Sequence, residues 1–414
     1  MITKLAWRNL WRHKRRTLLS VVGIGFAVAV LQFFMGIQLK SYDSAINASV
    51  SLYYGHLQIQ PEGYLDDPEV RKVLAAPQAL LGSLKSITDV KAAALRASSF
   101  ALLSSEDRTY GAQIVGVEFD NEPHVSSIPG VIRQGVFFTS ADAQQIIMGR
   151  ALADNLRLRV GDSVTILGQS RDGSLAAMVL PLAGIFESGS RDLDRNIVEM
   201  PLRTFQENFG MEGAAHNIVV RARSASSLES LRGEISRIIS RSYPNPGTLA
   251  PPVVLTWEEL LPGLKESIEL DMSFGWLFYF SLILVVTLSV ANTLLMSVLE
   301  RVREFGVMMS LGATPKRVAG LIVVESLLLG FLGVLIGTAF GVAVLRYYGV
   351  HGFSIPGTEE FLKIWNIPGA VFPEITFAVV SIAPCVLLLT VLLATIYPVC
   401  KVMRLTPVQA LHAV

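Results

Sequence analysis

The chain has 414 residues, which is enough for two or three domains. Of these residues, 51% are hydrophobic and 17% are charged, whereas a soluble domain carries about 25% charged residues. The composition therefore excludes an ordinary soluble protein and indicates a membrane protein. The formal net charge is +1, and because the charges are unevenly placed, this value says nothing about partners. No nucleic-acid partner is expected.

Four apolar runs are long enough to cross a bilayer, which takes about 20 residues. These expected transmembrane helices comprise residues 17–39, 272–299, 318–345 and 375–400. The first run follows a basic start, as in a cleaved signal peptide, but its 23 residues exceed the usual apolar region of about 7–15. The expected fold is therefore an α-helical membrane protein with four transmembrane helices, one before and three after a large extracytoplasmic α+β domain, residues 40–271.

Lys and Arg residues near the span ends predict the orientation of the chain. Twelve Lys and Arg residues lie before the first span, between the second and third spans, or after the fourth span, and the order of the spans puts all three segments on the same side of the membrane. These residues are Lys4, Arg8, Arg12, Lys14, Arg15, Arg16, Arg301, Arg303, Lys316, Arg317, Lys401 and Arg404. The connection on the other side, residues 346–374, has only Arg346 and Lys363. We therefore expect residues 1–16 and the tail, residues 401–414, to be cytoplasmic and the large domain to lie outside.

Residues 1–16 predict a basic helix that lies in the membrane surface. Their cations recur at helical spacing, and tryptophans stand between the cationic and apolar faces. Such a helix places its apolar side in the lipid and its cations near anionic headgroups. We expect Trp7, Arg8, Trp11 and Arg12 to anchor it.

The large domain mixes strand and helix patterns. Alternating apolar and polar residues predict strands over residues 55–60, 92–103, 110–119, 145–149, 164–167, 178–186, 217–222 and 253–257. Helices are predicted over residues 69–86, 150–156 and 227–240. Residues 40–54 are expected to continue the first helix, and long extensions of the first two spans to form a stalk. This mixture is typical of the α+β class.

Residues 300–317, called the elbow below, form a charged segment between the second and third spans. Gly312 suits the end of a helix, and Thr314 with Pro315 suits the start of the next. We therefore expect a separate short helix. A segment this short between two spans must lie against the membrane surface, where a soluble partner can push on it.

The third span carries a stripe of glycines with a period of four, namely Gly333, Gly337 and Gly341. Small residues at this spacing let two helices approach closely in lipid. The partner helix belongs either to this chain or to a second subunit in the membrane. Glu325 lies near the cytoplasmic end of the same span, and we expect its carboxylate to reach toward the headgroups rather than relay protons.

The motifs of common catalytic sites are absent from the sequence. It contains no GxxxxGK[ST] phosphate-binding loop, no HExxH or CxxC motif and no GxSxG motif. The six histidines are scattered. We therefore expect a subunit that is not an enzyme and that binds no metal or cofactor itself.

Several motifs resemble those of the FtsX-like and MacB-like permeases of ABC transporters. The elbow region ERVREFGVMMSLGATPKRV, residues 300–318, is the most specific. The segments LAWRNLWRHKRRTLL at residues 5–19, GRALA at 149–153, VGDSV at 160–164, ESLLLG at 325–330 and PVQAL at 407–411 also fit. The likeness covers nearly the whole chain, and the order of one span, a large outer domain and three spans agrees with it.

This resemblance implies a multi-pass protein of the bacterial inner membrane that transmits mechanical movement. The elbow would be the coupling helix that docks on a separate ABC ATPase dimer, where ATP and Mg²⁺ would bind. The residues expected at this contact are Arg301, Arg303, Glu304, Met308 and Leu311. A second permease, either a copy or a paralogue, would complete the membrane part.

The segment YGHLQIQPEGYLDDP, residues 54–68, is similar to the start of the outer domain in the lipoprotein-releasing, LolC/LolE-like branch. That likeness implies extraction of lipoprotein cargo from the membrane and its delivery to a periplasmic carrier. Two alternatives remain open. One is an FtsX-like regulator of periplasmic cell-wall hydrolases, and the other is a MacB-like exporter of small amphiphiles that works with an adaptor protein.

Overall fold

The computed structural model describes residues 2–12, 14–224, 227–242, 250–354, 357 and 371–404. The chain divides into two compact units, which we call the helical unit (residues 1–43, 267–356 and 369–414) and the sheet unit (residues 44–266 and 357–368). The end of the expected tail, with the 407–411 motif, and Lys363 of the expected connection lie outside the described residues.

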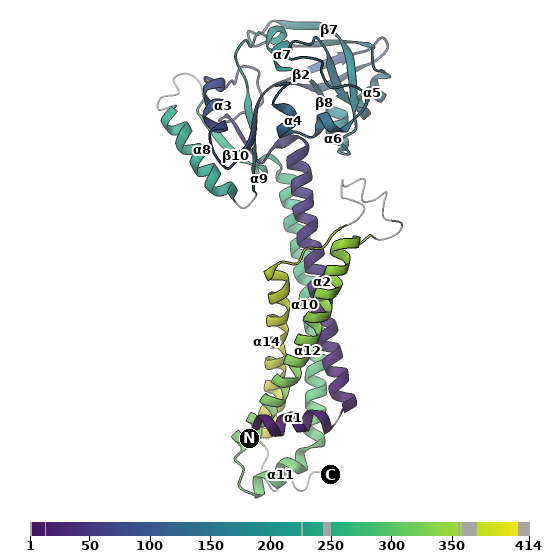
Figure 1. Ribbon diagram of the computed structural model, residues 1–414, viewed down its shortest axis with the longest axis vertical. Coiled ribbons are helices and arrows are strands. Elements are labelled where there is room, and N and C mark those ends of the chain that lie inside the picture. Colours follow the sequence, from purple (N-terminus) through teal and green to yellow (C-terminus); the bar gives the residue numbers. More distant parts are fainter. Residues whose placement is uncertain are drawn as a thin grey trace. The chain divides into compact units, whose positions relative to one another are not determined.

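The described part of the chain contains four helices that are long and apolar enough to cross a membrane, which confirms the expected number. The helices that contribute to the helical unit are α1 (Ile2–Arg12), α2 (Lys14–Ser49), α10 (Pro262–Glu300), α11 (Val302–Ser310), α12 (Pro315–His351) and α14 (Phe377–Met403). Figure 1 shows α2, α10, α12 and α14 running alongside one another. Two of these helices, α2 and α10, extend well beyond the apolar runs of the sequence, since α2 continues to Ser49 and α10 begins at Pro262.

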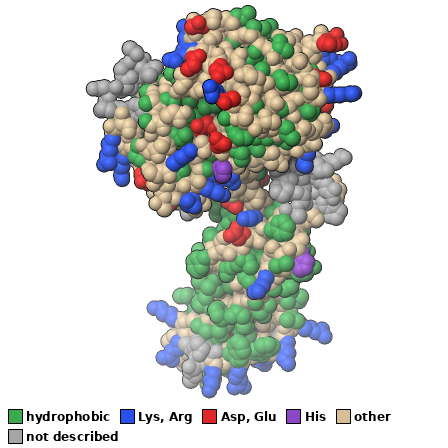
Figure 2. Space-filling model, turned by 45° about the horizontal axis from the view of Figure 1, so that its top comes forward, with side chains coloured by type: hydrophobic (Ala, Val, Ile, Leu, Met, Phe, Trp, Pro, Cys, Tyr) green, Lys and Arg blue, Asp and Glu red, His purple; other side chains and the backbone are tan. Residues whose placement is uncertain are grey.

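Large apolar side chains cover much of the outside of these helices. Phe26, Phe274, Phe340 and Phe377 are all exposed. Figure 2 shows this apolar surface, with Lys and Arg side chains gathered at one end. A continuous apolar surface of this size indicates contact with lipid.

The glycine stripe of α12 lies against α2 of the same chain. A Cβ atom on Gly337 would stand 2.5 Å from the carbonyl oxygen of Gly25, and one on Gly333 would stand 2.8 Å from Cβ of Ile24. A Cβ atom on Gly341 would collide with the side chain of Gln32. The stripe therefore permits close backbone approach within the chain, one of the two arrangements that the sequence left open.

The sheet unit contains ten strands in its described residues. They are β1 (Leu57–Pro61), β2 (Val90–Ser104), β3 (Thr109–Val117), β4 (Ile132–Gly135), β5 (Ile146–Gly149), β6 (Ser163–Gln169), β7 (Leu175–Phe186), β8 (Ile197–Pro201), β9 (Asn217–Ala222) and β10 (Pro252–Thr256). Its helices and helical turns are η1 (Val50–Tyr54), α3 (Pro77–Lys85), α4 (Glu122–Val125), η2 (Ile128–Val131), α5 (Arg150–Leu156), α6 (Arg191–Asn196), α7 (Leu202–Phe209), α8 (Leu228–Ser242) and α9 (Trp257–Leu260). The mixture confirms the expected α+β class.

One long strand, β2, connects two parts of the sheet. Its first half pairs with β9, which leads through β1 to the edge strand β10. Its second half pairs with β3 and β6, and the pairings β3–β8, β8–β5, β5–β7 and β7–β6 close a six-stranded barrel. Closure removes exposed strand edges from this part of the sheet.

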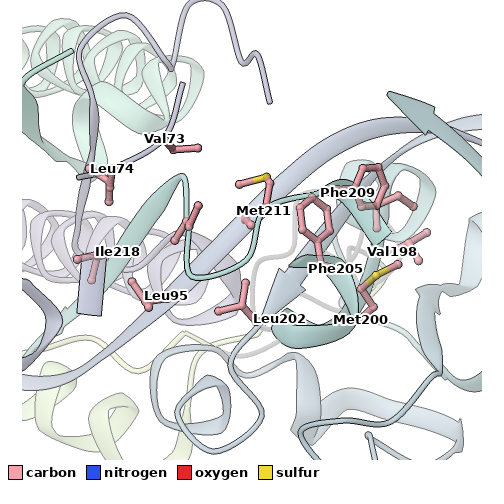
Figure 3. Close-up of a cluster of buried hydrophobic side chains, with 14 of the residues drawn as sticks. Val73, Leu74, Leu95, Val198, Met200, Leu202, Phe205, Phe209, Met211 and Ile218 are labelled. Atoms are coloured by element: carbon pink, nitrogen blue, oxygen red, sulfur yellow. The ribbon is translucent and has the colours of Figure 1, made fainter. Parts of the chain in front are cut away.

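The main core of the sheet unit lies on one face of the sheet and inside the barrel. Figure 3 shows part of it, with Phe205 and Phe209 of α7 beside Val198 and Met200 of β8. The two phenylalanine rings stack, with centroids 4.3 Å apart. Val73 and Leu74 enter the same core. Burial of these apolar side chains is the main stabilising contribution to this unit.

Most of the predicted strands are confirmed, as is the helix over residues 150–156. The prediction of a helix over residues 69–86 is only partly right, because α3 begins at Pro77. Residues before it follow an irregular path in which the Leu74 amide donates to the carbonyl oxygen of Ala215 over 2.9 Å. The sequence did not predict β8, whose five residues are all buried and which carries Glu199 in its middle.

Three ionisable side chains are buried together in the sheet unit. Arg96 of β2 donates to both carboxylate oxygens of Glu122 and to the backbone carbonyl of Tyr53. Glu199 lies nearby with both carboxylate oxygens unpaired within the described residues. Burial, together with repulsion from Glu122, raises the pKa of Glu199 to about 8, although Arg96 opposes this shift.

We predict that Gly337→Ala destabilises the helical unit by about 1–3 kcal/mol, because the added methyl group must push α2 and α12 apart. Gly320→Ala in the same helix is the matched control, since a Cβ atom there meets nothing within 4 Å. Unfolding of the full chain in detergent is the measurement. Equal stability of the two variants would contradict the close approach.

We predict that Glu199→Gln removes a pH dependence from the stability of the sheet unit. The folded protein keeps the Glu199 proton up to about pH 8, whereas an unfolded glutamate loses it near pH 4.3, at about its ordinary pKa. The free energy of unfolding of the wild type therefore falls by a few kcal/mol as pH rises between these values.

Thermal unfolding of the full chain at pH 5 and at pH 8.5 measures this difference. The exposed carboxylate of Glu62 makes Glu62→Gln a suitable control, and it should keep the slope of the wild type. An unchanged slope in Glu199→Gln would show that Glu199 is ionised in the folded protein.

Candidate functional site

The elbow is a separate short helix between two long ones. α10 ends at Glu300, α11 covers Val302–Ser310, and α12 begins at Pro315. The break after α11 is made by Gly312, whose φ of +93° favours glycine. Thr314 then precedes Pro315 in an extended conformation. The structure thus confirms the helix end and helix start that were predicted from Gly312, Thr314 and Pro315.

One face of α11 is buried against the neighbouring helices. Val302, Phe305 and Met309 of α11 form a cluster with apolar residues of α10, α12 and α14. Those partners are Val298, Val318, Ile322 and Val402. Because the contacts come from three other helices, the elbow cannot turn independently of the bundle.

A buried ion pair fixes the start of the elbow. Arg301 donates from Nη1 to both carboxylate oxygens of Glu325 in α12, at 3.2 and 2.9 Å. The two side chains are only 9% and 12% exposed. The guanidinium also lies over the ring of Phe305, 5.2 Å from its centroid. The sequence predicted no protein partner for Glu325, whereas the structure pairs its carboxylate with Arg301.

Further ion pairs join the elbow to the N-terminal helices. Glu304 accepts from Arg301 at 3.2 Å and from Arg12 of α1 at 2.8 Å. One turn earlier, Glu300 accepts from Arg16 of α2 at 2.8 Å, and Arg16 also donates to the hydroxyl of Ser297. Each exposed pair contributes little, but together with the buried pair of Arg301 and Glu325 they connect α1, α2, α10, α11 and α12 at one end of the bundle.

The other face of the elbow is exposed. Leu311 is 82% exposed, Arg303 and Val307 are exposed, and Met308 is half-buried. Lys316 and Arg317 at the start of α12 are exposed as well. The surface therefore combines an apolar projection with cationic side chains, a combination suited to a partner protein that offers a pocket with acidic residues around it.

The residues expected at the partner contact thus divide into two groups. Arg303, Met308 and Leu311 lie on the exposed or half-exposed side, and Glu304 lies at its border. Arg301 is turned inward and positions the elbow, which differs from the expected contact role. Arg16 and Glu300 were not among the residues predicted for this site. No local pattern could identify this ion pair, because its members are 284 residues apart in the chain.

The expected anchoring residues of α1 are exposed. Trp7 and Trp11 pack edge to face with their ring centroids 6.1 Å apart, while Ala6 and Leu10 face the bundle. Arg8 is exposed. Arg12 is exposed too, but it also binds Glu304, so α1 is attached to the elbow and not only to the membrane surface.

An apolar cavity lies between α2, α10 and α14 in the helical unit. Its volume is about 240 Å³, and Leu31, Met35, Trp276 and Ile283 are among its lining residues. Polar residues stand at one side of it. Gln38 binds the hydroxyl of Tyr42 at 2.7 Å and receives a hydrogen bond from Tyr279, while Tyr42 donates to Asp271. In the described residues, no group of His, Cys, Asp and Glu could hold a metal ion.

We predict that removal of either partner from the buried pair, as in Arg301→Ala or Glu325→Ala, lowers the free energy of unfolding by about 3–5 kcal/mol, because an unpaired charge stays buried. The double variant Arg301→Met with Glu325→Leu should recover most of that loss. Unfolding of the full chain in detergent measures all three. A double variant as unstable as the single ones would refute this account of the pair.

Two family models match the chain. The model of the MacB-like periplasmic core domain matches residues 17–238, which is more than half of the chain. The model of the FtsX-like permease C-terminal matches residues 276–407, which include the elbow. Together the two matches leave residues 1–16, 239–275 and 408–414 uncovered.

Individual relatives agree with these matches. The lipoprotein-releasing system transmembrane protein LolC of Neisseria meningitidis serogroup B is 22% identical over 100% of both chains. The uncharacterized ABC transporter permease YknZ of Bacillus subtilis is 23% identical over 82% of this chain and 84% of its own length. The macrolide export ATP-binding/permease protein MacB of Pasteurella multocida is 23% identical over 81% of this chain and 52% of its own, so the chain spans about half of that relative. The chain therefore belongs to the MacB- and FtsX-like family of ABC transporter permeases, as a membrane protein whose sheet unit is an extracytoplasmic domain.

Proposed function

We propose that this chain transmits ATP-driven movement of a separate ATPase subunit to its extracytoplasmic domain, and that the movement serves to release lipoproteins from the bacterial inner membrane. The observation that carries the proposal is the construction of the elbow. It has an exposed cationic and apolar face for a partner, and its opposite face is held rigidly by apolar packing and ion pairs.

The proposed orientation places both termini and the elbow in the cytoplasm. Arg8, Lys14 and Arg15 of the N-terminal helices, and Arg303 and Lys316 of the elbow, belong to one side of the membrane by the order of the four spans. Cationic residues concentrate on the cytoplasmic side of membrane proteins. An ATPase in the cytoplasm would therefore meet the elbow directly.

The path of the movement is proposed to follow α2 and α10. Each is a single continuous helix that includes residues of both units. Near the elbow, Arg16 of α2 binds Glu300 of α10. Toward the other ends of these helices, Tyr42 of α2 binds Asp271 of α10. A push on the elbow would thus displace α2 and α10 together.

Lipoprotein release is supported by the match to LolC over the full length of both chains. The apolar cavity between α2, α10 and α14 agrees with a cargo that carries hydrocarbon chains. Export of a small amphiphile is the second candidate, because a macrolide exporter is also among the relatives. A second permease subunit and a soluble periplasmic carrier are part of the first proposal.

We predict that Arg303→Glu reduces cargo release by the complex about tenfold, because like charges at an interface oppose docking. The complex is purified from native membranes with its ATPase and reconstituted in liposomes. ATP hydrolysis and release of bound lipoprotein into solution are measured together. Arg133→Glu, an exposed site in the sheet unit, is the matched control and should behave as the wild type.

Two results would count against the proposal. Normal coupling in Arg303→Glu would remove the elbow from the contact with the ATPase. Release of an added small amphiphile, but of no lipoprotein, would favour the export function instead.

A further inference from the structure

One face of the sheet in the sheet unit is unusually polar. The pairing of β1 with β9, of β9 with β2 and of β2 with β3 places a set of polar side chains on the same face. These side chains are Gln58, Gln60, Asn217, Arg96, Ser98 and Gln113. The opposite face of the same strands carries Leu57, Ile59, Leu95 and Ile218 and belongs to the main core.

A cavity of about 250 Å³ opens on this polar face. Tyr53 and Tyr54 of η1 form one wall, and Tyr64 and Leu65, which follow β1, form another. Phe100 of β2 also lines it and is 63% exposed. The cavity is therefore a polar surface bordered by aromatic rings, and it lies entirely within the sheet unit.

Some of the polar groups in the cavity bind one another. Gln58 donates to the carbonyl oxygen of Tyr54 over 2.8 Å, Asn217 donates to Gln58 over 3.2 Å, and the hydroxyls of Tyr64 and Ser98 are 2.7 Å apart. These bonds fix the orientation of the side chains around the cavity.

Other polar groups in the cavity have no partner within the described residues. The side chain of Gln60 makes no hydrogen bond there although the residue is only 2% exposed, and Gln113 makes none either. The carbonyl oxygen of the Asn217 side chain is buried and unpaired. Buried polar groups are normally hydrogen-bonded, so the buried side chain of Gln60 indicates that something polar binds it. Gln113, which is half-buried, lines the same cavity.

The charges around the cavity favour a neutral ligand. Among the described residues, Arg96 is the only charged one that lines it, and its guanidinium is already bound by Glu122 and the carbonyl oxygen of Tyr53. No carboxylate from the described part of the chain lines the cavity, so these residues do not form the usual site for a cation. Amide side chains both donate and accept hydrogen bonds, and a ligand with hydroxyl groups does the same.

We propose that this cavity binds a sugar ring. Hydroxyl groups of the ring would bind Gln60 and Gln113, and its apolar face would lie on the aromatic ring of Phe100. An extended peptide fits less well, because such peptides bind at the free edge of a sheet, and the backbone groups of β1, β9 and β2 already pair with one another.

Saturation-transfer NMR on the full chain in lipid nanodiscs free of sugar detergents tests the proposal. Glucose, galactose and N-acetylglucosamine are the probes, and trialanine is the peptide probe. At least one of the sugars should receive saturation transfer from the wild-type protein. Gln60→Ala and Gln113→Ala should each weaken its binding about fivefold, the effect of losing one or two neutral hydrogen bonds. Gln134→Ala, an exposed glutamine of β4, should bind as the wild type does.

A parallel measurement distinguishes a free sugar from a lipid headgroup. A glucosyl diacylglycerol in the nanodisc should raise the unfolding temperature of the wild type, but not that of Gln113→Ala, if the sugar is presented by a lipid. The proposal fails if no sugar probe shows transfer and the glycolipid has no effect. It also fails if the glutamine variants bind as the wild type does, or if only trialanine shows transfer that depends on Gln60 and Gln113.

Discussion

Arg301 lies where α10 ends, and its guanidinium binds the carboxylate of Glu325 in the next long helix. Neither charge has much contact with solvent, so each requires the other. The pair ties the short helix α11 to α12 at the point where the backbone changes direction. Arg301 also binds Glu304, and Glu304 in turn binds Arg12 of α1. The N-terminal helix is therefore connected to Arg301 through Glu304.

The glycines of α12 set a second constraint on the helical unit. Gly333 and Gly337 let α12 approach the backbone of α2 closely, and Gly341 leaves room for the buried side chain of Gln32. α2 is therefore held at one end by Arg16, which binds Glu300, and along its length by α12. A helix fixed in this way moves as a unit with its neighbours, which is what a mechanical role requires.

The sheet unit uses its two faces differently. One face and the barrel interior are closed by apolar residues such as Phe205 and Phe209. The other face holds the buried group of Arg96, Glu122 and Glu199 and, beside it, the open polar cavity. The first face accounts for stability, whereas the second contains buried polar groups that stability alone does not explain.

The sequence by itself determined the four spans, the α+β class of the outer domain, the end of the elbow helix and the start of the helix after it. These features depend on local properties: the length of an apolar run, the alternation of residues along a strand, and the backbone preferences of Gly312 and Pro315. Only the tertiary structure decided which charges pair, that β2 closes a barrel, and that Gln60 and Gln113 share a cavity. Arg12 and Glu304 are 292 residues apart in the chain. Pairing over such a separation depends on how helices and strands pack, and no local pattern of residues specifies that packing.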